Sequence, residues 1–271
     1  EPLLLAGLKD PNAGVRSTAA MMIGRLKLAD AAPACRPLAT DPSPFARASA
    51  IYALSRCGQP VNSTPLARLL LHDPSTRVRA HVAFLLGELG EPSAAGLLRE
   101  AARGASSRST QPAEQRLFLA QVSEALVKLG EHSQVEPIRA HLYPSRPEDL
   151  EATALAAQIL GQLRDKGSTD ELIYLTAYKD RQGNRMPAEI RLAAAGSLAR
   201  LGNDKGSFVA DEYAASDMAV LRAQSAFVYG EIGRAENLPK LEKLLGDQTG
   251  IVRVSAAGAV LKLNSAPVAA R

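Results

Sequence analysis

The stretch DPNAGVRSTAAMMIGRL, residues 10–26, decides the fold, because the same phrase returns along the rest of the chain. Seven further copies, some of them degenerate, begin at Asp41, Asp73, Glu114, Leu150, Ala188, Met218 and Asp247. Aligned on the position of Gly24, the eight copies fall at Gly24, Ser55, Gly87, Val127, Gly161, Ala199, Gly230 and Leu261. Three of the intervals are 31 residues and the others are 32 to 40 residues. A period near 31 with longer intervals indicates stacked supersecondary units with insertions in their loops.

Each copy predicts a helical hairpin. A short apolar stretch such as PLLLAGL ends at Asp-Pro, because proline lacks an amide donor and restricts the residue before it. The longer segment that follows places Val15, Ala19, Ile23 and Leu26 on one helical face. A small residue inside this second helix, such as Gly24, predicts the close approach of a neighbouring helix. Several copies end in a glycine that suits a left-handed helix cap, namely Gly58, Gly90, Gly130, Gly202 and Gly233.

The phrase DPxxxVRxxAAxxLGxL resembles the short HEAT-like repeats of the phycobilisome-lyase class, and the resemblance covers residues 1–264. It implies an all-α fold, a right-handed, armadillo-like α-solenoid (alpha-alpha superhelix) of about eight hairpins in one domain, with a C-terminal tail at residues 265–271. It also implies a structural ladder of hydrogen bonds between the Asp and Arg residues of neighbouring units. The matching positions are Asp10, Arg16, Asp41, Arg47, Asp73, Arg79, Arg191, Arg222, Asp247 and Arg253.

The middle of the array is expected to be irregular. Leu119 and Thr153 stand in place of the ladder arginine in copies four and five, where the spacing stretches to 40 and 34 residues. Polar segments at residues 104–113, 143–149 and 178–187 predict loops. We therefore expect a bend or a functional protrusion in this part of the chain.

The composition predicts a soluble helical protein with a weak basic bias. Hydrophobic residues make up 46% of the chain but aromatic residues only 4%, so Ala, Leu and Val must fill the interior. The net charge of +4 comes from residues 1–135, which hold 15 basic and 11 acidic residues against 17 of each in residues 136–271. No apolar run of about 18 residues predicts a membrane span. The abundance of Ala and the preference for Arg over Lys suggest a bacterial source.

The sequence does not decide between a cytoplasmic protein and a periplasmic or exported one. The chain begins at Glu1 rather than Met, which is consistent with the removal of a targeting segment. Cys35 and Cys57 match neither a disulfide framework nor a metal-ligand spacing, and we expect them to be small buried hydrophobic residues.

No pattern in the sequence points to catalysis, a metal ion or a cofactor. His72, His81, His132 and His141 fall in different repeats and form no HxxxH, HExxH or Cys/His arrangement. No His precedes a Glu, the dipeptide with which HEAT-like hydroxylases hold iron, and no Trp is present for a site like that of HEAT-like DNA glycosylases. P-loop and GxSxG motifs are also absent. We therefore predict that the chain is not an enzyme.

The outward positions of the second helices form the expected recognition surface, because these helices line the concave side of a right-handed stack. They lie 1, 2, 5 and 9 residues after the ladder arginine. The +5 column holds Met21, Tyr52 and Phe84 in consecutive units, and exposed apolar columns mark contact sites. A helix rotated by one position would instead bury these side chains. The residues predicted to contact a partner are Met21, Arg25, Tyr52, Arg56, His81, Phe84, Glu88 and Phe227.

The preferred functional interpretation is a non-enzymatic scaffold that binds a peptide or a protein surface through its concave face. An apolar and aromatic strip with a rim of mixed charge suits such a partner better than a phosphate backbone. Two alternatives stay open. The resemblance permits a bilin-lyase-like or chaperone-like factor that acts on a protein partner, and the basic N-terminal half permits a weak nucleic-acid binder.

Overall fold

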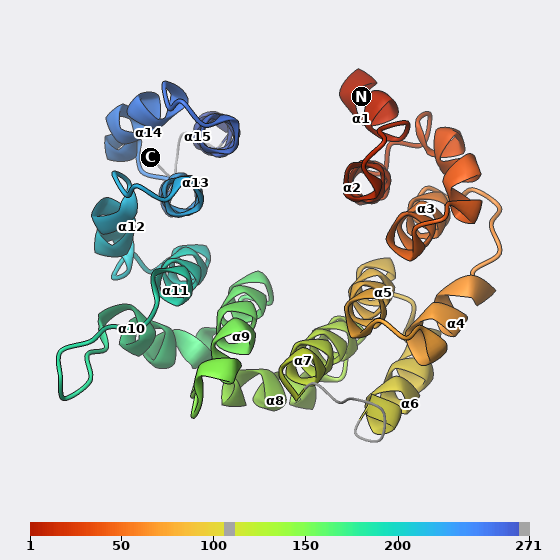
Figure 1. Cartoon of the computed structure of the whole chain (residues 1–271), viewed down its shortest axis with the longest axis horizontal. Helices are drawn as coiled ribbons and strands as arrows, with labels where there is room; N and C mark the ends of the chain where they lie inside the picture. The colour runs from red at the N-terminus through yellow and green to blue at the C-terminus, as the bar shows by residue number, and fades with distance from the viewer. Residues whose placement is uncertain (106–111, 266–271) are drawn as a thin grey trace. The chain divides into compact units, whose positions relative to one another are not determined.

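The computed structural model describes residues 1–105 and 112–265, and every regular element within them is a helix. The chain divides into two compact units, Glu1–Pro137 and Ile138–Arg271, which run from red to yellow-green and from green to blue in Figure 1. The predicted all-α repeat fold is confirmed for the described residues. The single domain expected over residues 1–264 stays a prediction.

Eight helical hairpins account for the described part of the chain. Their first helices are α1(Pro2–Gly7), η1(Ala32–Thr40), α4(Thr64–His72), α6(Ala95–Ala105), α8(Val135–Ala140), α10(Thr169–Ala177), α12(Ser207–Tyr213) and α14(Leu238–Leu245). Their second helices are α2(Ala13–Arg25), α3(Pro44–Arg56), α5(Thr76–Leu89), α7(Pro112–Lys128), α9(Leu150–Gln162), α11(Ala188–Arg200), α13(Ala219–Ile232) and α15(Gly250–Ser265). Short 3₁₀ turns lie between them: η2(Pro92–Ala94), η3(His132–Gln134), η4(Pro147–Asp149), η5(Lys166–Ser168) and η6(Ala235–Asn237).

The helix ends follow the local signals in the sequence. The side chain of Asn12 accepts a hydrogen bond from the backbone N–H of Gly14 (2.8 Å) and caps the start of α2. Gly90 and Gly233 end α5 and α13 with φ angles of 75° and 72°, a left-handed conformation that is strained for residues with a Cβ. The other glycines predicted at helix ends also have positive φ, and they are Gly58, Gly130 and Gly202.

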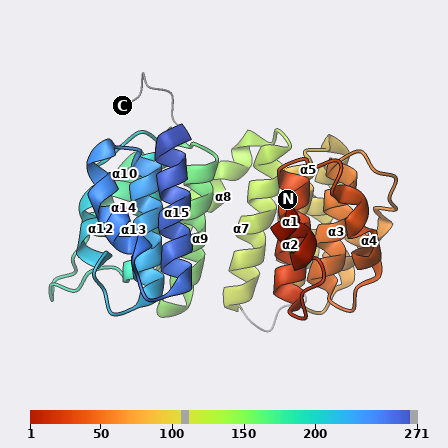
Figure 2. The same ribbon diagram turned by 90° about the horizontal axis from the view of Figure 1, so that it is seen from above.

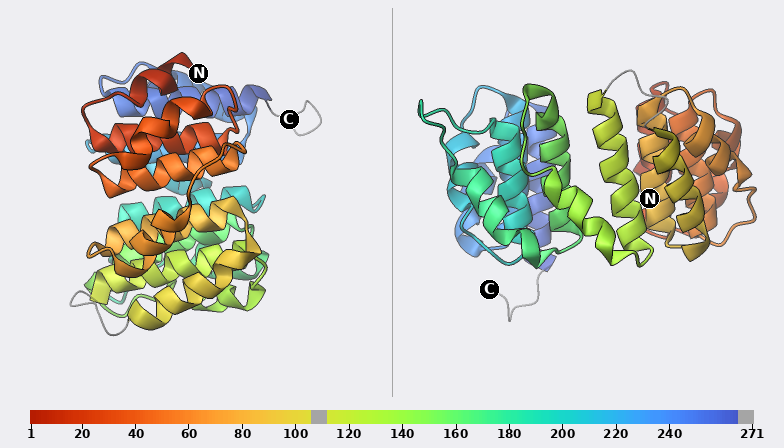
Figure 3. Two further views of the ribbon diagram at one scale, coloured as in Figure 1. Left: turned by 90° about the vertical axis from the view of Figure 1, so that its right-hand side faces the viewer. Right: turned by 90° about the horizontal axis from the view of Figure 1, so that it is seen from below.

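Each unit consists of two layers of helices. The second helices lie side by side, α2, α3, α5 and α7 in the first unit and α9, α11, α13 and α15 in the second (Figures 1 and 2). The first helices cover one side of this layer, as the two views of Figure 3 show, and the apolar core lies between the layers. The side chains at the +2, +5 and +9 positions of the second helices that are not buried, such as Thr18, Met21 and Phe227, lie on the opposite side, which we call the second-helix face.

Glycines at one repeat position set how closely the second helices approach each other. A Cβ placed on Gly230 would lie 2.8 Å from the Cα of Ala259, so α13 and α15 pack backbone against backbone. The four glycines with this relation to the next second helix are Gly24, Gly87, Gly161 and Gly230. They join α2 to α3, α5 to α7, α9 to α11, and α13 to α15. The alternate copies carry Ser55, Val127, Ala199 and Leu261 at this position, and α3 packs less closely on α5, as does α11 on α13.

The three segments expected to be loops differ in how much of each lies outside a helix. Residues 143–149 form turns and the short η4, and residues 178–187 form a loop held by an isolated bridge between Lys179 and Arg185. The ends of the segment 104–113 belong to α6 and α7, so the expected loop is wrong there, and residues 106–111 lie outside the described residues. Of the expected tail, Ser265 ends α15 and the remainder also lies outside them. Among the described helices, none combines the length and apolar character needed to cross a membrane.

Two rungs of the expected ladder are present, one in each unit. Arg16 donates from Nε and Nη2 to the carboxylate of Asp41 (2.8 and 2.9 Å), and Arg222 does the same to Asp247 (2.7 and 3.0 Å). The hydrogen bonds from these guanidinium groups lower the pKa of Asp41, and they lower that of Asp247 to about 2. Each rung therefore links consecutive hairpins through a charge-assisted bidentate pair.

Arg79 and Arg191 find other partners than the sequence predicted. Arg79 donates to the carbonyls of Leu70 and Ala101, and its guanidinium lies 4.5 Å from the centre of the Phe118 ring. Arg191, which is buried, binds the carboxylate of Glu212 (2.8 Å). The reason is that the following copies have no aspartate at the ladder position, which is occupied by Ala113 and Ser216.

The remaining ladder positions form no rung. The carboxylates of Asp10 and Asp73 accept the backbone N–H two residues later (2.8 and 2.9 Å), and Arg47 and Arg253 donate to backbone carbonyls. Asp10 precedes the first arginine and Arg253 follows the last aspartate, so neither has a repeat on that side among the described residues. Arg47 and Asp73 belong to consecutive copies and still do not pair.

Gly230→Ala should destabilise the second unit, because the new Cβ would lie 2.7 Å from the Cβ of Ala259 and force α13 away from α15. We expect the free energy of unfolding to fall by roughly 1–3 kcal/mol, as in other overpacked interiors. Denaturation with urea measures it. Gly258→Ala is the matched control in α15, where a Cβ meets nothing within 4 Å. It should raise the free energy of unfolding by up to about 1 kcal/mol, because alanine has a higher helix propensity than glycine. Equal effects of the two substitutions would contradict the close contact at Gly230.

Candidate functional site

Two concavities lie on the second-helix face, one in each unit. The first, which we call the N-terminal groove, has a volume of about 430 Å³. Its lining residues come from α2, the start of α3, and α5, and they are Ala13, Gly14, Ser17, Thr18, Met21, Ser43, Phe45, His81 and Phe84. The groove thus brings together Met21, His81 and Phe84, three of the side chains that the sequence predicted as partner contacts.

Aromatic rings form the far wall of the N-terminal groove. The rings of Phe45 and His81 lie 5.4 Å apart between centroids, at an interplanar angle of 54°. The Nζ of Lys128 lies 5.0 Å from the centre of the Phe84 ring and 2.6 Å from the carboxylate of Glu88. Of the residues predicted at the rim, Arg25 is exposed, whereas Arg56 and Glu88 are partly buried. The groove is therefore apolar inside, with an ion pair at one edge.

Side-chain hydrogen bonds connect three consecutive second helices, α2, α3 and α5, at this groove. The hydroxyl oxygens of Ser17 and Ser49 lie 2.9 Å apart, and that of Ser49 lies 2.9 Å from Nε2 of His81. Burial lowers the pKa of His81 to about 4, against a weaker opposing effect of a hydrogen bond with the backbone of Phe45. His81 is consequently neutral at pH 7 and can supply one N–H and one acceptor nitrogen to its neighbours.

Tyr52 does not line the groove, and the predicted exposure of this side chain is wrong. It is only 1% exposed, and its ring packs over Gly24 of α2, where a Cβ would lie 2.7 Å from Cε1 of the tyrosine. The physical reason is the glycine itself, because it leaves a space between α2 and α3 that the ring fills. Tyr52 therefore belongs to the core of the first unit.

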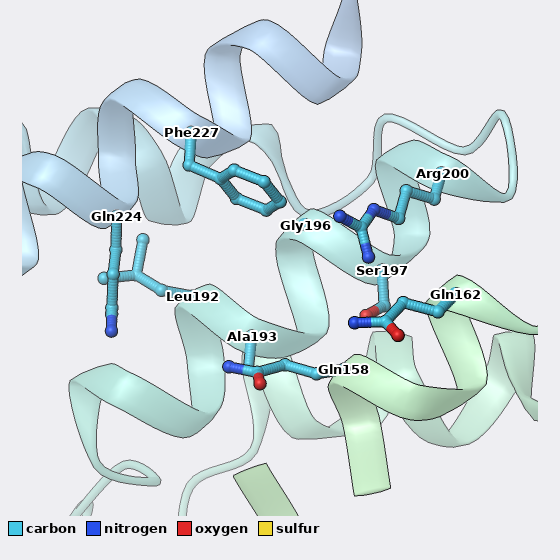
Figure 4. A pocket seen from close by; sticks show the side chains of 9 residues that line it. All are labelled: Gln158, Gln162, Leu192, Ala193, Gly196, Ser197, Arg200, Gln224 and Phe227. Carbon is cyan, nitrogen blue, oxygen red and sulfur yellow. The ribbon is translucent and has the colours of Figure 1, made fainter. Parts of the chain in front are cut away.

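The second concavity, which we call the C-terminal pocket, has a volume of about 340 Å³ and lies across α9, α11 and α13. Figure 4 shows the ring of Phe227 over Gly196, with the amides of Gln158 and Gln162 and the guanidinium of Arg200 around it. Phe227, which the sequence predicted as a partner contact, is 44% exposed. The remaining lining residues are Leu192, Ala193, Ser197 and Gln224.

The polar groups of this pocket are only partly satisfied. The guanidinium of Arg200 lies 5.1 Å from the centre of the Phe227 ring and 3.4 Å from the carboxylate of Glu231, so its charge is compensated. The Oε1 of Gln224 is buried and accepts no hydrogen bond from a described residue. Buried amide oxygens are normally paired, so this atom lacks, in the observed conformation, the partner that such a group usually has.

The sequence interpretation selected only Phe227 among these residues. Apart from Leu192 and Ser197, the other residues of the pocket also occupy the +2, +5 and +9 columns, but the prediction favoured aromatic residues over glutamine and glycine. The columns themselves were the signal that could have found Gln158, Gln162, Gly196, Arg200 and Gln224.

The described residues offer little for catalysis. They contain no group of three or more His, Cys, Asp or Glu residues that could hold a metal ion. Ser49 and His81 have the spacing of a nucleophile and its base, but Ser49 is 0% exposed and no carboxylate is shown bonded to His81. This pair therefore cannot reach a substrate in the observed conformation.

The sequence comparison identifies the repeats at the start of the chain. Residues 1–80 match the profile of the family described as HEAT repeats. Over these 80 residues the chain is similar to HEAT repeats. The match ends within α5, and the remaining hairpins continue the same alternation of short first and longer second helices. No curated protein sequence matches the chain.

Solved structures with a similar arrangement of HEAT or armadillo helices include natural and designed proteins. Human deoxyhypusine hydroxylase in complex with glycerol is 18% identical, with 98% of this chain and 96% of that chain covered and a TM-score of 0.45. The complex of CpcE and CpcF of phycocyanin lyase from Nostoc sp. PCC7120 is 20% identical, with 97% and 93% covered and a TM-score of 0.44. A designed armadillo repeat protein in complex with the peptide (KR)4 is 15% identical, with 73% and 98% covered and a TM-score of 0.43. The likeness extends to helical repeat architecture and no further.

Lowering the pH should destabilise the first unit through His81. The folded state holds this side chain neutral down to about pH 4, whereas the unfolded chain takes up a proton near pH 6.5. The stability that neutral His81 contributes is therefore fully present above pH 6.5 and lost as the pH falls towards 4, up to about 3 kcal/mol. Denaturation curves from pH 7 to 4 measure the loss, and His81→Gln should flatten that part of the profile. A titration of the His81 ring near pH 6.5 by NMR would contradict this expectation.

Proposed function

We propose that the chain is a non-enzymatic scaffold that binds an extended segment of a partner protein on its second-helix face. The C-terminal pocket carries this proposal. Its three glutamine amides can each donate and accept hydrogen bonds, as a peptide backbone requires, and the half-exposed ring of Phe227 offers an apolar contact. The unsatisfied Oε1 of Gln224 supports it further, because a rotation of this buried amide towards the pocket would let a backbone N–H of a bound segment pair with the oxygen.

The N-terminal groove supports the same kind of ligand. Met21, Phe45 and Phe84 give it an apolar lining of the kind that takes an aliphatic or aromatic side chain. Met21 and Phe84 occupy the +5 column of their helices, as Phe227 does in the C-terminal pocket. The proposed face therefore uses the same repeat position for its apolar contacts in both units.

The charges of the second-helix face disfavour a nucleic acid. Arg200 pairs with Glu231, and Lys128 pairs with both Glu88 and the buried Glu124. A phosphate backbone is bound by basic groups that exchange their counterions for phosphates. Basic side chains already neutralised by carboxylates are poor at this, whereas they suit the rim of a protein interface.

Phe227→Ala should reduce peptide binding about tenfold or more, because it removes the apolar contact at the centre of the C-terminal pocket. The measurement is selection of a displayed random peptide library on the immobilised chain, followed by affinity measurement for the enriched peptides. Gln224→Leu should weaken the same peptides by removing the amide, and it leaves no unsatisfied oxygen behind.

Tyr174→Ala is the matched control for Phe227→Ala. Tyr174 is 52% exposed and lies in the same unit, but it belongs to the first helix α10. Its removal should leave peptide affinity unchanged. The proposal fails if no peptide is enriched on the intact chain, or if both alanine variants weaken the enriched peptides equally.

A further inference from the structure

Arg47 lines a concavity of about 490 Å³ in the first unit, apart from the second-helix face. The other walls come from α4 and the turn after it. Arg68 and His72 supply basic groups, Asp73 supplies a carboxylate, and Pro65 and Leu69 are among its apolar walls. The proposed peptide-binding face uses none of these residues.

The guanidinium of Arg47 is held in the same way as those of the two ladder arginines. Its Nη1 donates to the carbonyls of Asp41 and Pro42 at 2.7 and 2.9 Å. Nη1 of Arg16 makes the equivalent pair of hydrogen bonds at 2.9 and 3.0 Å, and Nη1 of Arg222 makes it at 2.7 and 3.1 Å. All three groups are therefore oriented by the turn that precedes their helix.

The opposite edge of the Arg47 guanidinium has no partner among the described residues. In Arg16 and Arg222 this edge, formed by Nε and Nη2, holds a carboxylate through two hydrogen bonds of 2.7 to 3.0 Å. No described residue accepts a hydrogen bond from Nε or Nη2 of Arg47. The edge that binds two oxygens elsewhere is therefore unpaired, on a side chain that lines the concavity.

The length of the repeat explains why Asp73 does not fill this edge. Asp41 and Asp247 each follow their arginine by 25 residues, whereas Asp73 follows Arg47 by 26. Its carboxylate accepts the backbone N–H of Ser75 at 2.9 Å but no hydrogen bond from Arg47. Asp41 and Asp247 make the equivalent bond to a backbone N–H at 2.8 Å and hold an arginine as well. With one more residue between them, Arg47 is oriented to bind a carboxylate but Asp73 does not supply one.

We propose that Arg47 and Arg68 bind an oxyanion of a ligand, a carboxylate or a phosphate, at the place that an aspartate occupies beside Arg16 and Arg222. The planar edge of Arg47 matches two oxygens of such a group, and Arg68 adds a second positive charge. Arg47 is partly buried, so solvent screens its interaction with an oxyanion less than it screens that of the exposed Arg68. The site is independent of the peptide binding proposed above.

The test follows the Nε–Hε signal of Arg47 by NMR during titration with inorganic phosphate and, separately, with acetylated diglutamate. A saturable shift is expected with at least one probe. Arg68→Gln should weaken this probe at least threefold without disturbing the fold, because Arg68 is exposed on α4, and Arg47→Gln should abolish binding measured by calorimetry. Tighter binding of phosphate would identify a phosphorylated ligand, and tighter binding of the peptide an acidic one.

Arg253→Gln is the matched control, because Arg253 makes the same two bonds to carbonyls, at 2.9 and 3.0 Å, but is exposed in the last hairpin. It should leave the affinity unchanged. The proposal is overturned if neither probe saturates, or if Arg47→Gln and Arg68→Gln bind as the unmodified chain does.

A pair of aspartate variants tests whether Asp73 fills the edge in solution. Asp41→Asn should lower the melting temperature by several degrees, because it breaks a rung. Asp73→Asn should change it by less than a degree, since asparagine keeps the hydrogen bond to the N–H of Ser75. Equal losses from the two variants would show that Asp73 already pairs with Arg47, and would overturn the proposal.

Discussion

The close approach of paired second helices is the constraint on which the rest of the structure depends. Gly24, Gly87, Gly161 and Gly230 each let the next helix come so near that a single added Cβ would meet its backbone. The alternate repeats carry a larger residue at that position, and their second helices pack less closely on the next one, as α3 does on α5 and α11 on α13. The N-terminal groove and the C-terminal pocket each lie across three consecutive second helices, so each includes a closely packed pair and the looser boundary beside it.

Electrostatic pairing divides the surface into two kinds of region. On the second-helix face the basic groups beside the aromatic rings are compensated, as Arg200 is by Glu231 and Lys128 by Glu88. Beside α4 the ladder fails at one rung and leaves Arg47 oriented by carbonyls, with its second edge unused. The first arrangement suits a ligand recognised by its backbone and apolar groups, and the second suits a ligand recognised by its charge.

The sequence predicted the hairpins, their number and most of their ends, because these depend on periodicity and on local signals such as the Asp-Pro pairs and Gly90. It predicted the exposed column only in part. Tyr52 and Phe227 occupy the same repeat position, yet Tyr52 fills the space beside Gly24 and Phe227 remains half exposed. Whether a side chain at this position is buried depends on the residues that the neighbouring repeat places against it. The periodicity of a single helix does not predict those residues. The pairing of Arg79 and Arg191 differed for the same reason.

The alternation of glycine and larger residues makes two successive hairpins, rather than one, the true module of this chain. Loss or duplication of a single hairpin would bring two glycine-bearing helices together, or two without glycine, and would spoil the junction where it occurs. Changes in length by genetic duplication must therefore proceed in double steps to preserve the packing. Under a pulling force, each unit would likewise be expected to yield first at its looser junction, α3 with α5 or α11 with α13.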